Sequence, residues 1–496
     1  MAASLPTIRL PAAASRPVLL NWIEPTVVGG VGAGYFFLFS WLGIRRHETY
    51  HSFGRDLGLF DQVFWNTVHG RPFESTMSLG LAQPHSFFSD HFSPLLWVIV
   101  PFYAVIPGPQ TLLVVQTLAL ALGAWPVYLV ARHRLAAGYE RLLWVAVYFF
   151  FVPLTHINLF DFHEIVLAVP LLGFALYFID RGDMTRFWFA FAAALLVKEE
   201  VALIGVGFAA YVILERKLWS HGIAIAATSL AWFAGVTALA IPFFGQGRSY
   251  AYFAARYSAL GGSPLAVAHS VLTSPLGVAR LVVQHKKLAF LAALFGPVLA
   301  INLLSGWGLL LLLPTLAYLL LSNYAPQYSF TTQYSAPLIP LVVITAIWGF
   351  AHLSTSWRRP VTAMMLISTA VFAFALGDLP GSLKFESQSF EPEPRYHAFA
   401  SELARIPPHA RVAAENNLTS HLSERPFIIT LEFQSAATAD YVALDYAGVG
   451  YDRRHFGQQI ASFQAQGYQL VASGDGLALL SHAAGAGAIR PDTPTK

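Results

Sequence analysis

The feature that most constrains this chain is a set of long apolar segments without any charged residue. Residues 222–243 form one such segment, and residues 288–321 form a second, longer one. A helix needs roughly 20 apolar residues to cross a membrane core about 30 Å thick. Charged residues make up only 11% of the chain, whereas a soluble domain usually carries about 25%. The sequence therefore predicts an integral membrane protein.

The apolar segments predict an α-helical polytopic membrane protein with about eleven membrane-spanning helices. At about 1.5 Å per residue the segment 288–321 is too long for one crossing, so we expect a hairpin that turns near Ser305 and Gly306. The short apolar run 95–106 is predicted to be an interfacial or re-entrant helix. The other expected spans are residues 26–44, 110–131, 142–154, 165–179, 187–197, 201–214, 222–243, 335–353 and 361–377.

Lys and Arg in the short loops predict the orientation of these helices, because such loops face the cytoplasm when they are basic. The loops 155–164 and 322–334 contain no Lys or Arg and are assigned to the outer side. The N-terminal tail, residues 1–25, is then cytoplasmic, and the part of the chain beyond residue 377 is extracytoplasmic. The basic loop residues are Arg132, Arg134, Arg141, Arg181, Arg186, Arg216, Lys217, Arg358 and Arg359.

Residues 378–482 differ from the transmembrane part, residues 26–377, in their polarity and pattern. Strand-like runs alternate with helical ones, which predicts a small α/β soluble domain. The segment 468–482 is expected to be a hairpin that turns at Gly474-Asp475-Gly476. The domain lacks a phosphate-binding glycine loop, which favours recognition or capping over independent catalysis. Residues 483–496 are predicted to be a disordered end.

Composition excludes several classes of function. The chain has no cysteine, which excludes disulfides, thiol catalysis and Cys-ligated metal centres. Its formal net charge is only +3 and it contains no basic run, so there is no basis for nucleic-acid binding.

Carboxylates collect on the predicted outer side of the membrane. Asp56 and Asp61 lie in the long first outer loop, residues 45–94, which also contains His91. The cluster Asp161-Phe162-His163-Glu164 precedes the span 165–179. Asp161, His163 and Glu164 offer two or three hard ligands to a divalent cation such as Mg²⁺ or Mn²⁺. The alternative is that these acids only begin helices, where a negative charge is favourable.

Lys198-Glu199-Glu200 interrupts an otherwise apolar stretch. Each ionisable group at membrane depth costs roughly 2.5–3.5 kcal/mol and usually lines a cavity. The Lys198 ammonium suits a lipid phosphate as a point charge, although the triplet could instead be a self-neutralising turn. Arg256 lies in a basic, aromatic outer loop, residues 244–286, which fits an anionic headgroup or an ordinary interfacial belt.

These segments carry a resemblance. The runs RDLGLFDQVFWNTVHGRPF (55–73), FDFHEIVLAVPLLGFALYFIDRG (160–182) and LLVKEEVAL (195–203) resemble the prokaryotic membrane proteins grouped as domain of unknown function 2079. The tail run RVAAENNLTSHLSERP (411–426) is similar as well. That resemblance covers nearly the whole chain and implies the cytoplasmic membrane of a prokaryote. The family name itself implies no activity.

More distantly, the layout resembles the GT-C superfamily of membrane glycosyltransferases. Such enzymes have a long first outer loop with an acidic residue, and they generally invert the anomeric carbon of a polyprenyl-phosphate sugar. Carried over by position, Asp56 matches the first-loop acid, and Asp161 or Glu164 matches the acid of the second outer loop. Lys198 falls where a basic residue would meet the lipid phosphate. The paired acids frequent in that superfamily are here Arg55-Asp56-Leu57, which leaves the metal and the base open.

The sequence thus predicts an inverting GT-C-like glycosyltransferase that uses a lipid-phosphate sugar donor in the membrane. Asp56, Asp161 and Glu164 are the candidate catalytic residues, with Asp56 as general base. The candidate substrate-binding residues are Lys198, Glu199, Arg256, Asp61 and His91. The alternatives are a transporter or flippase for a lipid-linked or polar solute, and a non-catalytic envelope assembly protein. Transporters often contain internal repeats, and none is seen between the halves of this chain.

Overall fold

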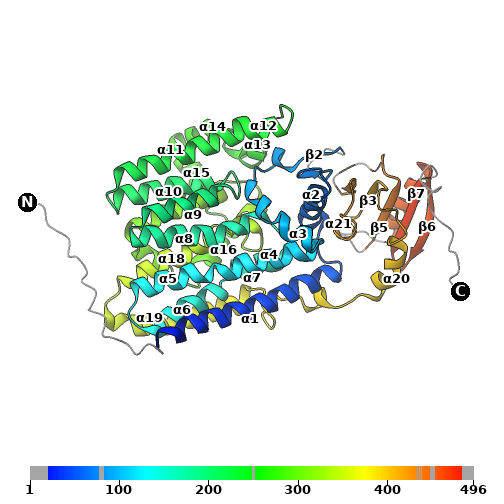
Figure 1. Ribbon diagram of the computed structural model, residues 1–496. Coiled ribbons are helices and arrows are strands. Elements are labelled where there is room, and N and C mark those ends of the chain that lie inside the picture. Colours follow the sequence, from blue (N-terminus) through cyan, green and yellow to red (C-terminus); the bar gives the residue numbers. More distant parts are fainter. Residues whose placement is uncertain are drawn as a thin grey trace, which may run out of the picture.

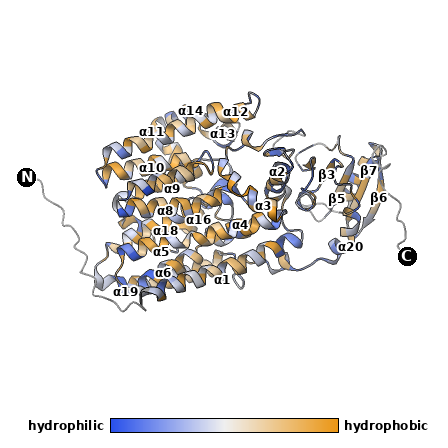
Figure 2. Cartoon of the chain, in the orientation of Figure 1, coloured by the Kyte–Doolittle hydropathy of each residue, from blue (hydrophilic) through white to orange (hydrophobic). Residues whose placement is uncertain are grey.

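The computed structural model describes residues 20–77, 83–248, 252–432, 434, 436, 438–446 and 453–482. A bundle of helices fills one end of the molecule, and a small sheet lies beyond the other end of the helices (Figure 1). Hydrophobic residues predominate along the helices of the bundle (Figure 2). The first 19 residues of the predicted cytoplasmic tail and the predicted disordered end, residues 483–496, lie outside the described residues.

Five helical stretches among the described residues are long and apolar enough to cross a membrane, and two bent helix pairs raise the number to seven. Three further apolar helices are shorter. The predicted count of eleven is not confirmed, because several expected spans fold as short or broken helices. The five long stretches are Trp22–Glu48, Pro109–Arg134, Trp219–Phe244, Gln333–Ala351 and Thr355–Leu376, and the bent pairs are Gly138–Phe149 with Val152–Leu159 and Pro264–Thr273 with Pro275–Val282.

Helix α18 is the core of the bundle. Every residue from Leu338 to Phe350 is buried, which explains why its sequence is apolar on all sides. Neighbouring helices are joined by tight turns, as where Gly182 ends α8 with φ 73° and the Asp183 side chain caps α9. The bundle helices are α1 (Leu20–Glu48), α4 (Pro109–Leu122), α5 (Ala124–Arg134), α6 (Gly138–Phe149), α7 (Val152–Leu159), α8 (Ala168–Arg181), α9 (Met184–Leu195), α10 (Val201–Leu214), α11 (Trp219–Gly235), α12 (Ile241–Phe244), α13 (Tyr252–Arg256), α14 (Pro264–Thr273), α15 (Pro275–Val282), α16 (His285–Phe295), α17 (Leu313–Leu320), α18 (Leu338–Ala351) and α19 (Thr355–Leu376).

The uncharged segment 288–321 is more broken than predicted. A turn does occur at Gly306, which has φ 60°, but the chain already leaves α16 at Phe295. Leu299 and Ala300 both adopt left-handed backbone conformations. Two 3₁₀ helices, η7 (Ile301–Leu304) and η8 (Gly306–Leu311), then lead into α17. The expected two-helix hairpin is therefore wrong in detail. The apolar composition of the segment predicts that it is buried, but not where its helices are interrupted.

The loop 45–94, predicted to be the first outer loop, folds into short elements that cover the end of the bundle. A π-helical turn, η1 (Gly54–Gly58), leads directly into α2 (Leu59–Val68). A small hairpin of β1 (Glu74–Ser75) and β2 (His85–Ser86) follows. The run predicted to be interfacial forms η3 (Pro94–Val98) and α3 (Val100–Val105) and exposes several large apolar side chains, namely Trp97, Val98, Phe102, Val105 and Ile106.

The tail forms a mixed five-stranded sheet in the order β4-β3-β5-β7-β6. Strands β4, β3 and β5 are parallel, and β7 is antiparallel to β5 and β6. The predicted hairpin at 468–482 is confirmed. The elements are α20 (Pro394–Leu403), β3 (Val412–Ala414), α21 (Asn416–Thr419), β4 (Ile428–Thr430), β5 (Tyr441–Asp445), α22 (Arg453–Ala465), β6 (Tyr468–Gly474) and β7 (Leu477–His482).

The tail packs tightly against the first outer loop. One hydrophobic core contains Phe60 and Phe64 of α2 together with Val412 and Leu418 of the tail. A Cβ added at Gly54 would lie 2.4 Å from the Cβ of Thr419. Only a residue without a side chain lets α21 approach the turn η1 this closely. Gly54, which precedes Arg55 and Asp56, thus allows the tail to pack directly against this loop.

Candidate active site

A cavity of about 490 Å³ lies where the first outer loop, the bundle and the tail meet. We call it the charged cavity. It brings together six of the residues predicted from the sequence, although they come from five separate parts of the bundle and its loops. These residues are Asp56, His91, His163, Glu164, Lys198 and Arg256.

Asp56 and His163 form a hydrogen-bonded pair in this cavity. His163 Nε2 lies 3.1 Å from Asp56 Oδ1, and His163 Nδ1 lies 3.0 Å from the carbonyl oxygen of Asp161. Both partners are acceptors, so the ring satisfies both only as an imidazolium. Burial opposes that charge, but the hydrogen bond and charge of Asp56 outweigh it and raise the pKa of His163. The pair is therefore a carboxylate facing an imidazolium.

Lys198 and Glu164 form a buried ion pair across the cavity. Lys198 Nζ lies 2.8 Å from Glu164 Oε1. Burial alone would raise the pKa of Glu164, but the Lys198 ammonium outweighs burial and holds it below its usual value. Glu164 stays ionised, so Lys198 presents a largely compensated positive charge to the cavity.

The Lys198-Glu199-Glu200 triplet is not a self-neutralising turn. Glu199 Oε1 accepts from His91 Nδ1 at 2.8 Å, and Glu199 Oε2 accepts from the amide of Phe92 at 3.2 Å. Although burial opposes ionisation of Glu199, His91 and Lys198 lower its pKa to about 2. Lys198 and Glu199 thus reach partners in two different loops. Glu199 orients His91, and only His91 of these two lines the cavity.

Asp161 is sealed behind the cavity wall. Its Oδ1 accepts from Arg46 Nη1 at 3.0 Å and its Oδ2 accepts from the Phe53 amide at 2.6 Å. Its side chain is only 1% exposed. Both oxygens hold other parts of the protein, so the structure does not place Asp161 where it would act on a substrate.

The predicted metal ligands are not assembled as a set. His163 faces Asp56, Glu164 faces Lys198, and Asp161 faces Arg46. Within the described residues, no group of three or more His, Asp and Glu side chains is placed to hold a metal ion. The donor set therefore does not fit the predicted divalent cation, because each of the three side chains already faces a different partner within the protein.

Asp61 also lies apart from the charged cavity. It is completely buried, accepting from Tyr103 Oη at 2.6 Å and from Ser423 Oγ at 2.7 Å. Burial raises its pKa to about 7. The predicted substrate contact is not formed, and Asp61 instead joins α2 to α3 and to the tail.

Arg256 sits in a cage of three tyrosines at one side of the cavity. Its guanidinium carbon lies 4.8 Å from the ring centre of Tyr252 and 5.3 Å from those of Tyr324 and Tyr334. It also donates to Tyr334 Oη at 3.1 Å. Such rings stabilise a cation without neutralising it. The three rings therefore hold the Arg256 guanidinium at the cavity wall.

An apolar groove of about 480 Å³ begins at this cage. Tyr252 and Arg256 line both the groove and the charged cavity. The rest of the groove is lined mostly by apolar side chains of α10, α11 and α17, among them Leu203, Val206, Phe233, Leu313 and Ala317. A polar cavity and an apolar groove thus meet at one arginine.

The sequence pattern did not reveal several residues of the site. Arg46 looks like an ordinary basic residue at the end of α1. Tyr334 is one of many outer tyrosines. Asn416 and Glu432 line the charged cavity from the tail, although the tail shows no catalytic motif. The available signal was the polar residue at the end of each predicted strand, because ligands bind at the carboxyl ends of parallel strands.

The fold is that of a polytopic helical membrane protein with a small mixed sheet in its tail. The structure is similar to that of ArnT from Cupriavidus metallidurans bound to undecaprenyl phosphate, with a TM-score of 0.56 over 95% of this chain and 99% of that chain. At 13% identity this likeness shows the fold alone. The model of the family described as predicted membrane protein (DUF2079) matches residues 46–479, so the chain belongs to that family. No curated protein matches the chain.

Proposed function

We propose that the protein is an inverting glycosyltransferase that takes a sugar from a polyprenyl-phosphate donor at the outer face of the cytoplasmic membrane. The observation that carries this proposal is the continuity between the charged cavity and the apolar groove at Arg256. A donor of this class has an apolar chain, an anionic phosphate and a polar sugar. The groove, the caged arginine and the charged cavity offer one environment for each.

The donor phosphate is held by Arg256 and Lys198 in this proposal. Three tyrosine rings hold Arg256 at the cavity wall, and its planar fork suits phosphate oxygens. Lys198 lies on the same cavity wall, where a phosphate would share its ammonium with Glu164. ArnT, which shares the fold, was crystallised with undecaprenyl phosphate, and this supports a polyprenyl-phosphate ligand for the present chain.

Asp56 is the proposed general base. It takes the proton from an acceptor hydroxyl as that oxygen bonds to the anomeric carbon. The bond from the anomeric carbon to the phosphate oxygen breaks, and the phosphate leaves with the electron pair. Attack from the side opposite the phosphate inverts the anomeric carbon. The His163 imidazolium holds Asp56 in place through the 3.1 Å hydrogen bond.

Charge stabilisation of the leaving phosphate comes from Arg256 and Lys198. Fixed positive groups aimed at developing negative charge lower the barrier without moving. The proposal derives no step through a divalent cation, because Asp161, His163 and Glu164 each face another partner.

Binding of undecaprenyl phosphate to the detergent-solubilised protein tests this assignment. A ligand at about 100 times its Kd stabilises the folded state by roughly 2.7 kcal/mol, which a thermal shift detects. We expect a shift in the parent, a smaller one in Arg256→Ala, and a parental one in Arg248→Ala. Arg248 is an exposed arginine near the end of α12 and is the matched control. No shift in the folded parent, or equal shifts in all three proteins, overturns the donor site.

A further inference from the structure

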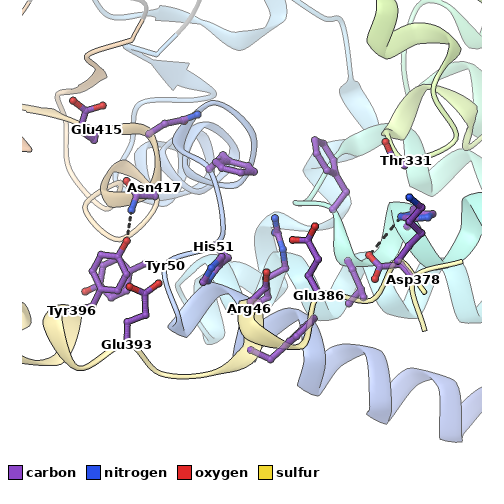
Figure 3. A pocket seen from close by; sticks show the side chains of 18 of the residues that line it. Arg46, Tyr50, His51, Thr331, Asp378, Glu386, Glu393, Tyr396, Glu415 and Asn417 are labelled. Atoms are coloured by element: carbon purple, nitrogen blue, oxygen red, sulfur yellow. Dashed lines mark hydrogen bonds and ion pairs between the residues drawn. The ribbon is translucent and has the colours of Figure 1, made fainter. Parts of the chain in front are cut away.

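A second cavity, of about 530 Å³, lies between the tail and the outer end of α1. We call it the junction cavity. Figure 3 shows its side chains, with Arg46 at the end of α1, His51 just after it, and Tyr50 stacked on Tyr396 of the tail, near Glu415 and Asn417. The predicted site uses none of these residues. The junction cavity is therefore a separate feature that needs its own account.

The two cavities share a wall. Phe160 and Asn416 line both of them. Phe160 stacks on the His163 ring, with 5.4 Å between ring centres, and His163 is the partner of Asp56. A ligand in the junction cavity thus lies behind the residue that holds the proposed base.

Carboxylates already neutralise two of the cations that line the junction cavity. Arg46 is paired with Asp161 at 3.0 Å. Arg395 is paired with Asp445 at 2.7 Å and with Glu393 at 2.6 Å. An anionic ligand would have to compete with these carboxylates for both arginines. The cavity therefore favours a neutral polar ligand over a phosphate or a carboxylate.

One buried acceptor in the junction cavity has no partner. Asn417 is 7% exposed, and its Nδ2 donates to Tyr396 Oη at 2.9 Å and to Asp445 Oδ2 at 2.7 Å. Its Oδ1 has no hydrogen-bond partner among the described residues. Buried acceptors are nearly always satisfied. Because both donors of the amide are fixed, Oδ1 is held ready to accept from a ligand hydroxyl.

The remaining lining suits a sugar ring. Phe53 and Phe390 line the cavity with aromatic surface for the CH face of a ring, whereas the Tyr50 ring is stacked on Tyr396 and His421. Glu386 and Glu415 offer carboxylate acceptors for hydroxyl groups. Glu415 and Asn416 also follow the carboxyl end of β3, which is where ligands bind in sheets with parallel strands.

We propose that the junction cavity binds the acceptor, a neutral hydroxyl-rich group of the carbohydrate class, and presents it to Asp56 past Phe160 and Asn416. Asn417 Oδ1 accepts from one of its hydroxyls. This inference rests on the proposed transferase function, since it assigns the second substrate of that reaction. It also gives the tail a role, because Asn417 and Glu415 belong to the tail.

Saturation-transfer NMR tests the assignment on the full chain in phospholipid nanodiscs free of sugar-headed detergent. The probes are the neutral trisaccharides maltotriose, mannotriose and triacetylchitotriose, with trigalacturonate as an anionic comparison. We expect at least one neutral probe to bind, and its affinity to fall about fivefold in Asn417→Ala through loss of one hydrogen bond. Gln464→Ala, an exposed amide on α22, is the matched control and should bind like the parent.

A second variant guards against misfolding. Glu386 is exposed, so Glu386→Ala should leave the fold intact while it weakens the neutral probe by about twofold to threefold. The inference is overturned if no neutral probe binds, if only trigalacturonate binds, or if both variants bind like the parent. Undecaprenyl-phosphate thermal shifts on the same samples separate the two proposals. A donor shift without trisaccharide binding defeats only the acceptor site, whereas the reverse result defeats only the donor site.

Discussion

The charged cavity and the junction cavity contain the same kinds of residues and differ in how these are paired. Each is lined by three Lys or Arg residues and four Asp or Glu residues. In the charged cavity, Glu164 is paired with Lys198, and three tyrosine rings surround Arg256. In the junction cavity, carboxylates neutralise Arg46 and Arg395. The numbers of charged residues alone would predict the same ligand for both cavities. The neighbours of each charged residue predict different ligands.

The two neighbouring acids of the site make the same point. Asp56 faces the charged cavity and has one ring as its hydrogen-bond partner. Asp161 is buried, with one oxygen on Arg46 and the other on the Phe53 amide. Sequence position made both of them candidates for catalysis. Their surroundings separate them, because Asp56 lines the charged cavity whereas Asp161 holds the loop that carries Asp56.

The largest expected effect is on turnover. Asp56→Asn removes the proposed base, and general-base catalysis contributes roughly 10²–10⁴-fold in rate. Glu415→Gln, across the shared wall, should raise KM for the acceptor and leave kcat within a few-fold. The measurement is the release of undecaprenyl phosphate from polyprenyl-phosphate-linked sugars in a native lipid extract, followed by mass spectrometry.

Undecaprenyl-phosphate binding is the control for both variants. It should persist in Asp56→Asn, since the carboxylate acts on the acceptor and not on the donor phosphate. Turnover by Asp56→Asn at the parental rate would remove Asp56 from the mechanism. If kcat fell as much in Glu415→Gln as in Asp56→Asn, the proposal that Glu415 only binds the acceptor would be wrong.

A second prediction concerns the contact that keeps the tail beside the loop. Gly54→Ala places a Cβ 2.4 Å from Thr419 Cβ, and overpacking of this kind costs about 1–3 kcal/mol. We expect a lower thermal midpoint and faster proteolysis between the bundle and the tail. Gly457→Ala is the control, because nothing lies within 4 Å of a Cβ at that position. Equal thermal midpoints for the two variants would mean that the contact between η1 and α21 does not contribute to the stability of the fold.

Much of the fold could be predicted from the sequence, because it depends on the length of apolar segments and on the spacing of apolar residues along helices and strands. The sequence has strand-like runs at 411–417, 426–433 and 439–446, and the strands at 412–414, 428–430 and 441–445 fall within them. The long helix at 219–244 was visible as an uncharged run. Helix breaks were not visible, since Leu299 and Ala300 adopt left-handed conformations that their side chains do not favour.

The sequence predicted which residues belong to the candidate site, but it did not predict which of them contact one another. Lys198 was expected to meet a lipid phosphate, and in the structure it is ion-paired with Glu164. Asp61 was expected near the substrate and instead holds Ser423, 362 positions away in the chain. Contacts of this kind depend on how distant segments pack together, and neither spacing nor composition contains that information. The tail's share of both cavities was missed for the same reason.

A third prediction uses the buried Asp61, which joins the tail to the loop beside the two cavities. Burial raises its pKa to about 7, whereas an unfolded Asp titrates near pH ~4. Between those values the folded protein keeps a proton that the unfolded chain releases. Stability therefore falls as pH rises from about 4 to about 7, by at most about 1.4 kcal/mol per pH unit. The thermal midpoint of Asp61→Asn should lose this part of the pH dependence.

The matched control for that measurement is Asp90→Asn, since Asp90 is only partly buried. Its thermal midpoint should follow the parental pH dependence. If Asp61→Asn also followed the parental curve between pH 5 and pH 7, the proton would be bound elsewhere. Docking of the tail would then not be linked to Asp61.

The smallest expected effect compares one tyrosine hydroxyl from each cavity. Tyr334 Oη accepts from Arg256 in the charged cavity, and Tyr396 Oη donates to Asp445 beside the junction cavity. Tyr334→Phe keeps the ring of the cage and removes one hydrogen bond, worth about 0.5–1.5 kcal/mol. We expect a Kd for undecaprenyl phosphate roughly threefold higher in Tyr334→Phe and unchanged in Tyr396→Phe. The Kd is measured by titration of each variant in nanodiscs. If both substitutions raised the Kd equally, donor binding would depend on both cavities. The assignment of the donor to the charged cavity and of the acceptor to the junction cavity would then be wrong.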